Sequence, residues 1–257
     1  MFNINCGKDK PLGPGGGSGN FSIQSGSPLT TDELKKALNL DKATSGLTNA
    51  AAQGNQQAAN ALIGIGIAGG SINTFLNYLT KGDLLNKLVN ITSPTEEIPI
   101  DLGNGITLIV SRTQVNDPAE GYEMTWKLNG TCTENSDISF NDKQIADGFL
   151  SSTYRNGRFN YDFGDLFSAS TCGLFNQGTE VIGTFLVEWA ISSDGTTNIY
   201  VSFNIDQTTN VNGNTFTTDL TYEATITINS DGTGNAKGKI KGTAQGVNYD
   251  QSFDVSW

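Results

Sequence analysis

Apolar and polar residues alternate along the last third of the chain. Nearly every second residue is apolar in residues 187–191, 199–205, 220–228, 236–242 and 247–257. Successive side chains of a β-strand point to opposite faces, so a period of two indicates strands with one apolar face and one polar face. Each of these stretches is therefore predicted to be a strand that packs on a core through one face only.

Six dipeptides that favour tight turns separate segments of strand length from about residue 96 onward. They are Asn104-Gly105, Asn129-Gly130, Asn156-Gly157, Asp194-Gly195, Asn212-Gly213 and Asp231-Gly232. Strands joined by tight turns pair antiparallel, which predicts an up-and-down sheet of roughly ten strands. Open sheets of that size usually curl or close, so we expect a strongly curved sheet or a barrel.

A short helix is predicted just ahead of this region. Thr30 and Glu33 have the spacing of a capping box, and Asp32 places a negative charge in the first helical turn. Leu34 and Leu38 then supply a short apolar face. We expect a helix over about residues 31–40.

A longer apolar segment with helical spacing follows, over residues 47–90. It contains the run ALIGIGIAGG, which is too short for a membrane span because Asn60 and Asn73 bracket it. A buried helix or helix pair is expected, and a segment at a membrane interface is the alternative. The residues Lys81-Gly82-Asp83 suggest a break between two helices, and Ser93-Pro94 suggests the end of the helical region.

These elements predict an α+β fold in which N-terminal helices cover a large antiparallel up-and-down meander. The apolar face of the sheet needs a cover, and the helical segment is the available apolar element. We expect a flexible tether over residues 1–28 and a single domain over 29–257. Within that domain, residues 29–93 form the helical segment and 96–257 form the meander.

Composition narrows the classes of function. The net charge is −11, from 15 Lys and Arg against 26 Asp and Glu, which argues against a nucleic-acid partner. The sequence contains no histidine, so Ser-His-Asp, Cys-His and zinc-protease sites are impossible. No cofactor and no metal are expected. Glu188 and Glu223 lie on neighbouring parts of the meander, but both are expected to face solvent, so catalysis by paired carboxylates is not expected.

Two of the three cysteines stand in similar polar surroundings. A disulfide between Cys132 and Cys172 would close a loop of about 40 residues, worth roughly 4 kcal/mol in the chain-entropy model. Two unrelated thiols are the alternative. A disulfide would indicate an oxidising compartment.

Cys6 precedes a run of Gly, Pro, Ser and charged residues, CGKDKPLGPGGGSG. That composition offers too little apolar surface to offset chain entropy, so a flexible linker is expected. A cysteine followed by such a linker resembles the mature start of bacterial lipoproteins. The resemblance implies lipidation of Cys6, export, and a membrane-tethered location in the periplasm or at the cell surface. Asn3, Ile4 and Asn5 depart from the usual lipobox, and a tail with an accidental thiol is the alternative.

Three functions fit this architecture. The first is a non-catalytic envelope or surface domain that binds or scaffolds an unknown envelope protein. The second is a carrier of an apolar small molecule or lipid, by analogy with barrels and half-barrels that have helical lids. The third is an outer-membrane β-barrel, because the ending YDQSFDVSW resembles the terminal strand of such barrels. The residues expected to line a carrier site, unless they are ordinary core, are Ile63, Ile65, Ile67, Phe75, Trp189, Phe203 and Tyr222.

Overall fold

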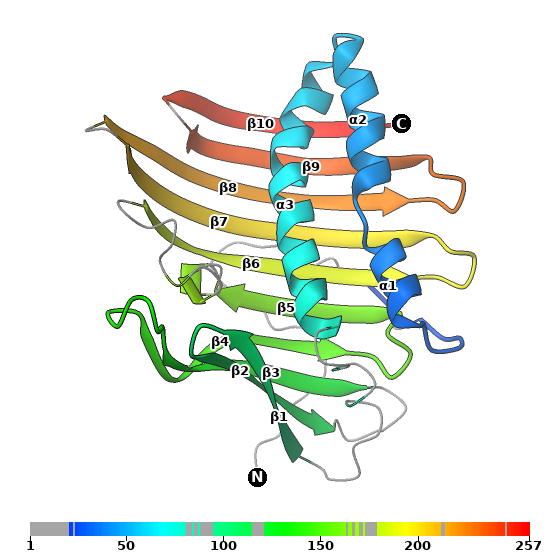
Figure 1. Cartoon of the computed structure of the whole chain (residues 1–257). Coiled ribbons are helices and arrows are strands. Elements are labelled where there is room, and N and C mark those ends of the chain that lie inside the picture. The colour runs from blue at the N-terminus through cyan, green and yellow to red at the C-terminus, as the bar shows by residue number, and fades with distance from the viewer. Residues whose placement is uncertain are drawn as a thin grey trace, which may run out of the picture.

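Three N-terminal helices precede a ten-stranded antiparallel sheet in the computed structural model (Figure 1). The helices are α1 (Thr31–Ala37), α2 (Asp41–Ala52) and α3 (Gln56–Thr80). The structure describes residues 21–22, 24–80, 84, 87, 95–114, 121–162, 164–165, 168–169, 172, 179–211, 214–244 and 246–257. The predicted α+β class, with helices first and a meander after them, is confirmed.

The strands follow each other across the sheet in sequence order, and each neighbouring pair is antiparallel. β1 and β10 lie at opposite edges, so the sheet is open and the expected barrel alternative is wrong. The bounds are β1 (Thr95–Gly103), β2 (Ile106–Gln114), β3 (Tyr122–Thr131), β4 (Ser139–Leu150), β5 (Asn156–Asp162), β6 (Thr179–Ile191), β7 (Thr197–Val211), β8 (Asn214–Ile228), β9 (Gly234–Ala244) and β10 (Val247–Ser256).

Three of the six predicted turns connect strands as expected. Asn104-Gly105 joins β1 to β2 with both residues at positive φ, 54° and 83°. Asp194-Gly195 and Asp231-Gly232 join β6 to β7 and β8 to β9, but in each of these turns only the glycine has positive φ. The aspartate side chain accepts a hydrogen bond from the backbone two residues later in both turns, which fixes a longer loop.

Two predicted turns are wrong because their glycines serve strand packing. Asn129-Gly130 lies inside β3, where the register against β4 shifts between Leu128 and Gly130, as in a β-bulge. Asn156-Gly157 begins β5, and a Cβ on Gly157 would lie 2.1 Å from the Trp189 ring. Asn212-Gly213 lies outside the described residues, and the residues on either side of it pair with each other.

The start of α1 is set by local interactions that the sequence predicted. The capping box is present: the Glu33 N–H donates to Thr30 Oγ1 (3.2 Å) and the Thr30 N–H donates to Glu33 Oε2 (2.8 Å). The first helix ends at Ala37, earlier than expected, and the next element is the helix pair α2 and α3. The expected break at Lys81-Gly82-Asp83 and the expected end at Ser93-Pro94 lie outside the described residues.

The core lies between the helices and one face of the sheet. α2 and α3 run side by side across the strands on that face (Figure 1). Phe75 of α3 is at the centre, with its ring centroid 5.4 Å from Trp126, 4.5 Å from Phe159 and 6.1 Å from Trp189. The alternation predicted for residues 187–191, 199–205, 220–228 and 236–242 is confirmed, because the apolar residues of one face, among them Val187, Val201, Ala224 and Ile240, are buried in the core.

Helix α3 is also long and apolar enough, between Gln56 and Leu79, to cross a membrane by length and composition. The apolar helix is therefore longer than the run bracketed by Asn60 and Asn73, because it continues past both residues. The core helix of a soluble protein meets the same criterion. In this structure Ala58, Ala61 and Ile65 are fully buried in the core.

The segment before α1 is attached to the sheet. The Gln24 N–H donates to Asn156 Oδ1 (2.6 Å), and Asn156 Nδ2 donates to the Ser22 carbonyl (3.0 Å). Arg155 Nε donates to the Ser27 carbonyl at 3.1 Å. Among the described residues, contacts with the sheet therefore reach back to Ser22, within the range of 1–28 expected to form the tether.

Candidate functional site

The residues expected to line a carrier site are mostly core residues in this structure. Ile65, Phe75, Trp189, Phe203 and Tyr222 are each at most 2% exposed and belong to the helix–sheet core. Ile63 and Ile67 of α3 are partly buried and pack against it. None of the seven lines either of the two depressions described below.

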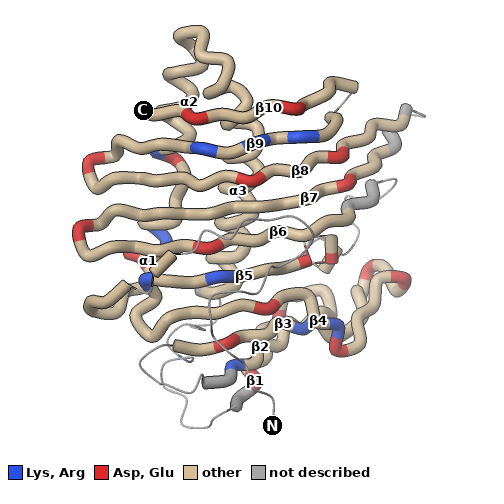
Figure 2. Tube along the Cα trace, turned by 180° about the vertical axis from the view of Figure 1, so that it is seen from behind, with Lys and Arg blue, Asp and Glu red and all other residues tan. Residues whose placement is uncertain are grey.

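The opposite side of the sheet, turned away from α2 and α3, is called the polar face here. A row of polar side chains crosses it from β6 to β10. Glu188 is paired with Tyr200, Tyr200 with Thr225, Thr225 with Lys237, and Lys237 with Asp254. Directly opposite residues of an antiparallel pair share a face, with Cβ atoms about 4.5–5.5 Å apart. Figure 2 shows this side, with acidic residues on β8 and β10 and basic residues on β9 between them.

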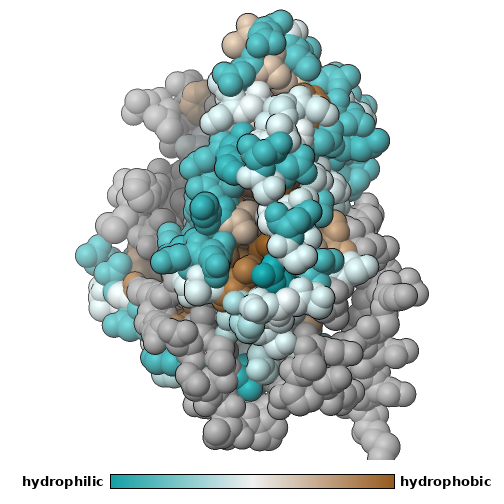
Figure 3. Space-filling model, turned by 90° about the vertical axis from the view of Figure 1, so that its right-hand side faces the viewer, coloured by the Kyte–Doolittle hydropathy of each residue, from teal (hydrophilic) through white to brown (hydrophobic). Residues whose placement is uncertain are grey.

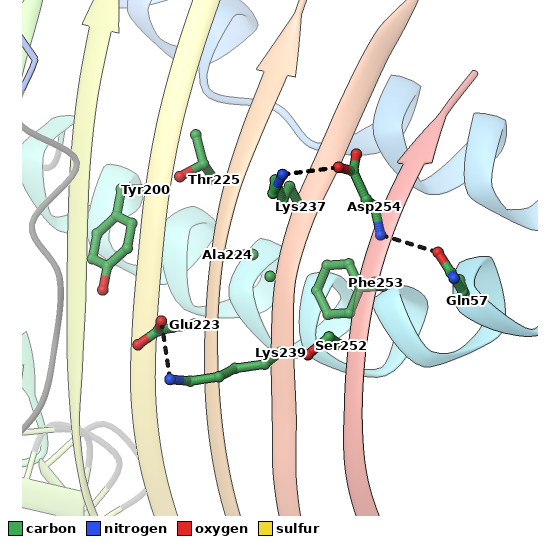
Figure 4. Close-up of a pocket in the computed structure, with 11 residues that line it drawn as sticks. Gln57, Tyr200, Glu223, Ala224, Thr225, Lys237, Lys239, Ser252, Phe253 and Asp254 are labelled. Carbon is green, nitrogen blue, oxygen red and sulfur yellow. Dashed lines mark hydrogen bonds and ion pairs between the residues drawn. The ribbon is translucent and has the colours of Figure 1, made fainter.

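A depression of about 480 Å³ lies on the polar face over β7 to β10 (Figure 4). Its polar lining includes Tyr200, Glu223, Lys237, Lys239, Ser252 and Asp254. Two ion pairs cross it: Lys237 Nζ lies 3.0 Å from Asp254 Oδ2, and Lys239 Nζ lies 3.3 Å from Glu223 Oε1. A hydrogen bond from Asn235 and the Lys237 ammonium both lower the pKa of Asp254.

The charges of the two ion pairs cancel, so the depression has little net charge but many hydrogen-bonding groups. Two carboxylates offer acceptors and two ammonium groups offer donors within one shallow surface. These pairs are half exposed, so water or a polar partner competes with them at little cost. The arrangement suits a polar ligand or protein surface that carries both donors and acceptors.

Glu188 is not the solvent-facing residue that the alternation suggested. It is 6% exposed, and its Oε1 lies 3.0 Å from Arg158 Nε on β5. Tyr200 beside it is 5% exposed, and its pKa is raised first by burial and then by the Glu223 carboxylate. Glu188 lies on β6 and Glu223 on β8, with β7 between them. The two carboxylates that were considered as a possible catalytic pair are therefore not directly opposite each other.

A second depression, of about 410 Å³, lies at the end of the sheet between α1 and the β6–β7 and β8–β9 turns. Its apolar lining includes Leu29, Ile191 and Ile228. Charged residues of both signs also line it: Glu33, Lys36, Asp41, Lys42 and Arg155. Figure 3 views this end and shows hydrophobic surface at the bottom of a hollow within hydrophilic surroundings. Arg155 stabilises its wall by donating to the Ile191 and Ser192 carbonyls.

The predicted disulfide is present: Cys132 and Cys172 are bonded, with Cα atoms 5.6 Å apart. Cys6, the predicted lipidation site, lies outside the described residues. Among the residues that the structure describes, no group of three or more Cys, Asp or Glu could hold a metal ion.

Of the charged residues in the polar-face depression, Glu223 was considered from the sequence, whereas Lys237, Lys239 and Asp254 were not predicted. The signal for the lysines was the alternation of Lys237, Lys239 and Lys241 along β9, which placed three cations on one face of an acidic protein. Comparison of the chain with protein-family models, curated proteins and solved structures found no match.

Proposed function

We propose that the chain is a non-catalytic domain of the bacterial cell envelope or surface, and that it binds or scaffolds another envelope component through its polar face. The observation that carries the proposal is the difference between the two sides of the sheet in the described part of the chain. Helices α1 to α3 lie on the apolar side, whereas the polar side presents half-exposed ion pairs around a depression. A surface of paired charges and hydroxyls can bind a partner that carries complementary charges, and such binding requires no catalytic residues.

Attachment to the membrane through a lipid on Cys6 is part of the proposal. The linker composition after Cys6 supports it, and so does the Cys132–Cys172 disulfide, which is typical of exported proteins. With those two cysteines bonded, Cys6 is the one cysteine of the sequence outside the disulfide. The partner would then be another envelope protein, reached from the membrane across the linker.

The carrier and outer-membrane alternatives have less support. A carrier needs an internal space, but the expected lining residues are packed against each other and against α3. An outer-membrane barrel needs a closed sheet, but β1 and β10 are separate edges.

Binding is tested by co-sedimentation of the purified Cys6→Ser chain with isolated envelope that contains cell wall and membranes. We expect sedimentation with the envelope, and its loss in Lys237→Glu/Lys239→Glu. The matched control is Lys36→Glu/Lys42→Glu, which makes the same charge change in the end depression. The proposal fails if the chain stays in solution, or if only the control pair affects binding.

The anchor is tested separately, by mass spectrometry of the Cys6 peptide from the chain made from its own gene in its own cells. An acyl group on Cys6, with release of the Cys6→Ser variant from the membrane fraction, is the expected result. An unmodified thiol would overturn the anchor and leave the binding test unaffected.

A further inference from the structure

The last strand, β10, has an edge that pairs with no other strand in the described part of the chain. Its pairing with β9 shows which backbone groups face that edge. Gly234 and Trp257 exchange both backbone hydrogen bonds, at 3.0 Å each. Hydrogen-bonded and non-hydrogen-bonded pairs alternate along an antiparallel ladder. The N–H and C=O groups of Asn248, Asp250 and Ser252 therefore point away from β9, toward the open edge.

A side chain already occupies one position of that edge. The Asp254 N–H belongs to the same outward set, and it donates to Gln57 Oε1 of α3 at 3.1 Å (Figure 4). The Gln57 amide thus takes the place that a carbonyl of an eleventh strand would have. This hydrogen bond satisfies the Asp254 N–H. The other outward-facing residues, Asn248, Asp250 and Ser252, remain exposed.

The two edges of the sheet differ in their protection. β1 contains Pro99, which lacks an N–H, and proline is a common protection of edge strands. β10 contains no proline in its sequence VNYDQSFDVS. Unprotected edges bind extended peptides through main-chain hydrogen bonds, and the side chains beside the edge select the sequence.

Side chains on both faces of β10 specify the chemistry of an added strand. Val247, on the helix side, is 53% exposed and offers an apolar contact beyond the helices. On the polar face, Asp250 and Asp254 are exposed carboxylates. β9 shows what complements this pattern, because its Lys237 and Lys241 stand directly opposite Asp254 and Asp250.

We propose that the β10 edge binds an extended segment of a partner protein in which apolar residues alternate with lysine or arginine. The segment adds an eleventh strand along Asn248 to Ser252. Its basic side chains lie on the polar face beside Asp250, and its apolar side chains lie beside Val247. β9 occupies the equivalent position on the other side of β10 with the same alternation, GNAKGKIKGTA. This inference does not depend on the lipid anchor or on the polar-face depression.

The probe is a synthetic peptide with the β9 sequence GNAKGKIKGTA, blocked at both ends, added to the full chain. Amide hydrogen exchange measured by NMR is the readout. We expect the exchange of the Asn248, Asp250 and Ser252 amides to slow when the peptide is added. A peptide with glutamate in place of its three lysines should not slow exchange, since like charges directly opposite each other destabilise a strand pair.

Two variants locate the binding. Ser252→Pro removes one outward N–H without breaking a bond to β9 and should abolish binding. Asp250→Lys should weaken binding by about tenfold or more, equivalent to about 1.4 kcal/mol. Asp219→Lys is the matched control, because it makes the same charge change on the polar face of β8, an interior strand. If Ser252→Pro fails to fold, the peptide affinities of Asp250→Lys and Asp219→Lys are compared, and that comparison alone tests whether the peptide binds at the β10 edge.

Three results would overturn the inference. The first is no change in exchange with the peptide. The second is equal binding of the lysine and glutamate peptides. The third is slow exchange at this edge without peptide, together with a concentration-dependent dimer that Asp250→Lys dissociates, which would make the occupant a second copy of the chain.

Discussion

The backbone of α3 at Gly64 lies directly over the ring of Tyr222 in β8. A Cβ placed on Gly64 would lie 1.9 Å from Tyr222 Cε2, far inside van der Waals contact. Tyr222 is itself fully buried, with its ring stacked 5.1 Å from Phe203 and 5.8 Å from Phe253. The ring has no free space to move into, so this glycine allows the helix to approach the sheet closely.

Gly64→Ala should therefore destabilise the fold. Overpacking of a filled core typically costs about 1–3 kcal/mol, more than the gain of about 0.5–1 kcal/mol from replacing a helical glycine by alanine. Urea unfolding followed by circular dichroism gives the change in the free energy of unfolding. The matched control is Gly66→Ala in the same helix, where a Cβ would have no atom within 4 Å. Gly66→Ala should stabilise by up to about 1 kcal/mol. Similar effects of the two substitutions would contradict the close approach at Gly64.

The disulfide should contribute measurably to stability. Removal of both partners, by Cys132→Ser/Cys172→Ser, should lower the free energy of unfolding by about 2–4 kcal/mol, because the unfolded chain gains the entropy of an open 40-residue loop. Denaturant unfolding with and without reductant measures the same quantity in the unmodified chain. Cys6→Ser is the control and should leave stability unchanged. Alkylation of three thiols in the unreduced, denatured chain would show that the bond is absent in solution.

Much of the fold could be predicted because local chemistry determines it. The alternation in β7, from Ile199 to Ile205, needs no knowledge of the rest of the chain, and neither does the capping box of Thr30 and Glu33. Closure of the sheet could not be predicted in the same way. Whether ten strands close depends on twist and stagger summed over all neighbours, and no single segment encodes that sum.

The candidate site was harder to predict than the fold. Its depression depends on cross-strand register, which brings Lys239 beside Glu223 and Lys237 beside Asp254 from three strands. Glu188 was misplaced because alternation predicts the face of a residue and not its burial. A dipeptide such as Asn156-Gly157 misled for a related reason, since its glycine is needed beneath the Trp189 ring and not in a turn.

The Arg158–Glu188 ion pair should be worth more than the exposed pairs of the same face. The side chains of Arg158 and Glu188 are 32% and 9% exposed, against 71% and 55% for Lys237 and Asp254. Glu188→Leu leaves the guanidinium without this carboxylate and should cost about 1–3 kcal/mol. Lys237→Ala should cost at most about 1 kcal/mol.

A double-mutant cycle separates the pair from the packing of each residue. Arg158→Leu/Glu188→Leu should be less destabilised than the sum of its two single variants, because no uncompensated charge remains. Urea unfolding of the four proteins supplies the values. Strict additivity would mean that the two charges do not interact in solution.

Buried tyrosines should make the fold sensitive to alkali. Burial raises the pKa of Tyr154 to about 12, and it raises the pKa of Tyr161 and Tyr222 above the ordinary value of 10.0. The folded chain holds these protons more tightly than the unfolded chain does. Their contribution to stability is therefore complete below about pH 10 and is lost as the pH rises through the folded values, first through that of Tyr154 near pH 12.

Each such tyrosine should lower the free energy of unfolding by about 1.4 kcal/mol per pH unit between its unfolded and folded pKa values. Urea unfolding at pH 8, 10, 11 and 11.5, values chosen to bracket that onset, measures the slope. Tyr222→Phe should make the slope shallower and leave stability near neutral pH unchanged or higher, because the Tyr222 hydroxyl is buried without a hydrogen-bond partner among the residues that the structure describes. An unchanged slope in Tyr222→Phe would mean that its hydroxyl reaches water in the folded chain.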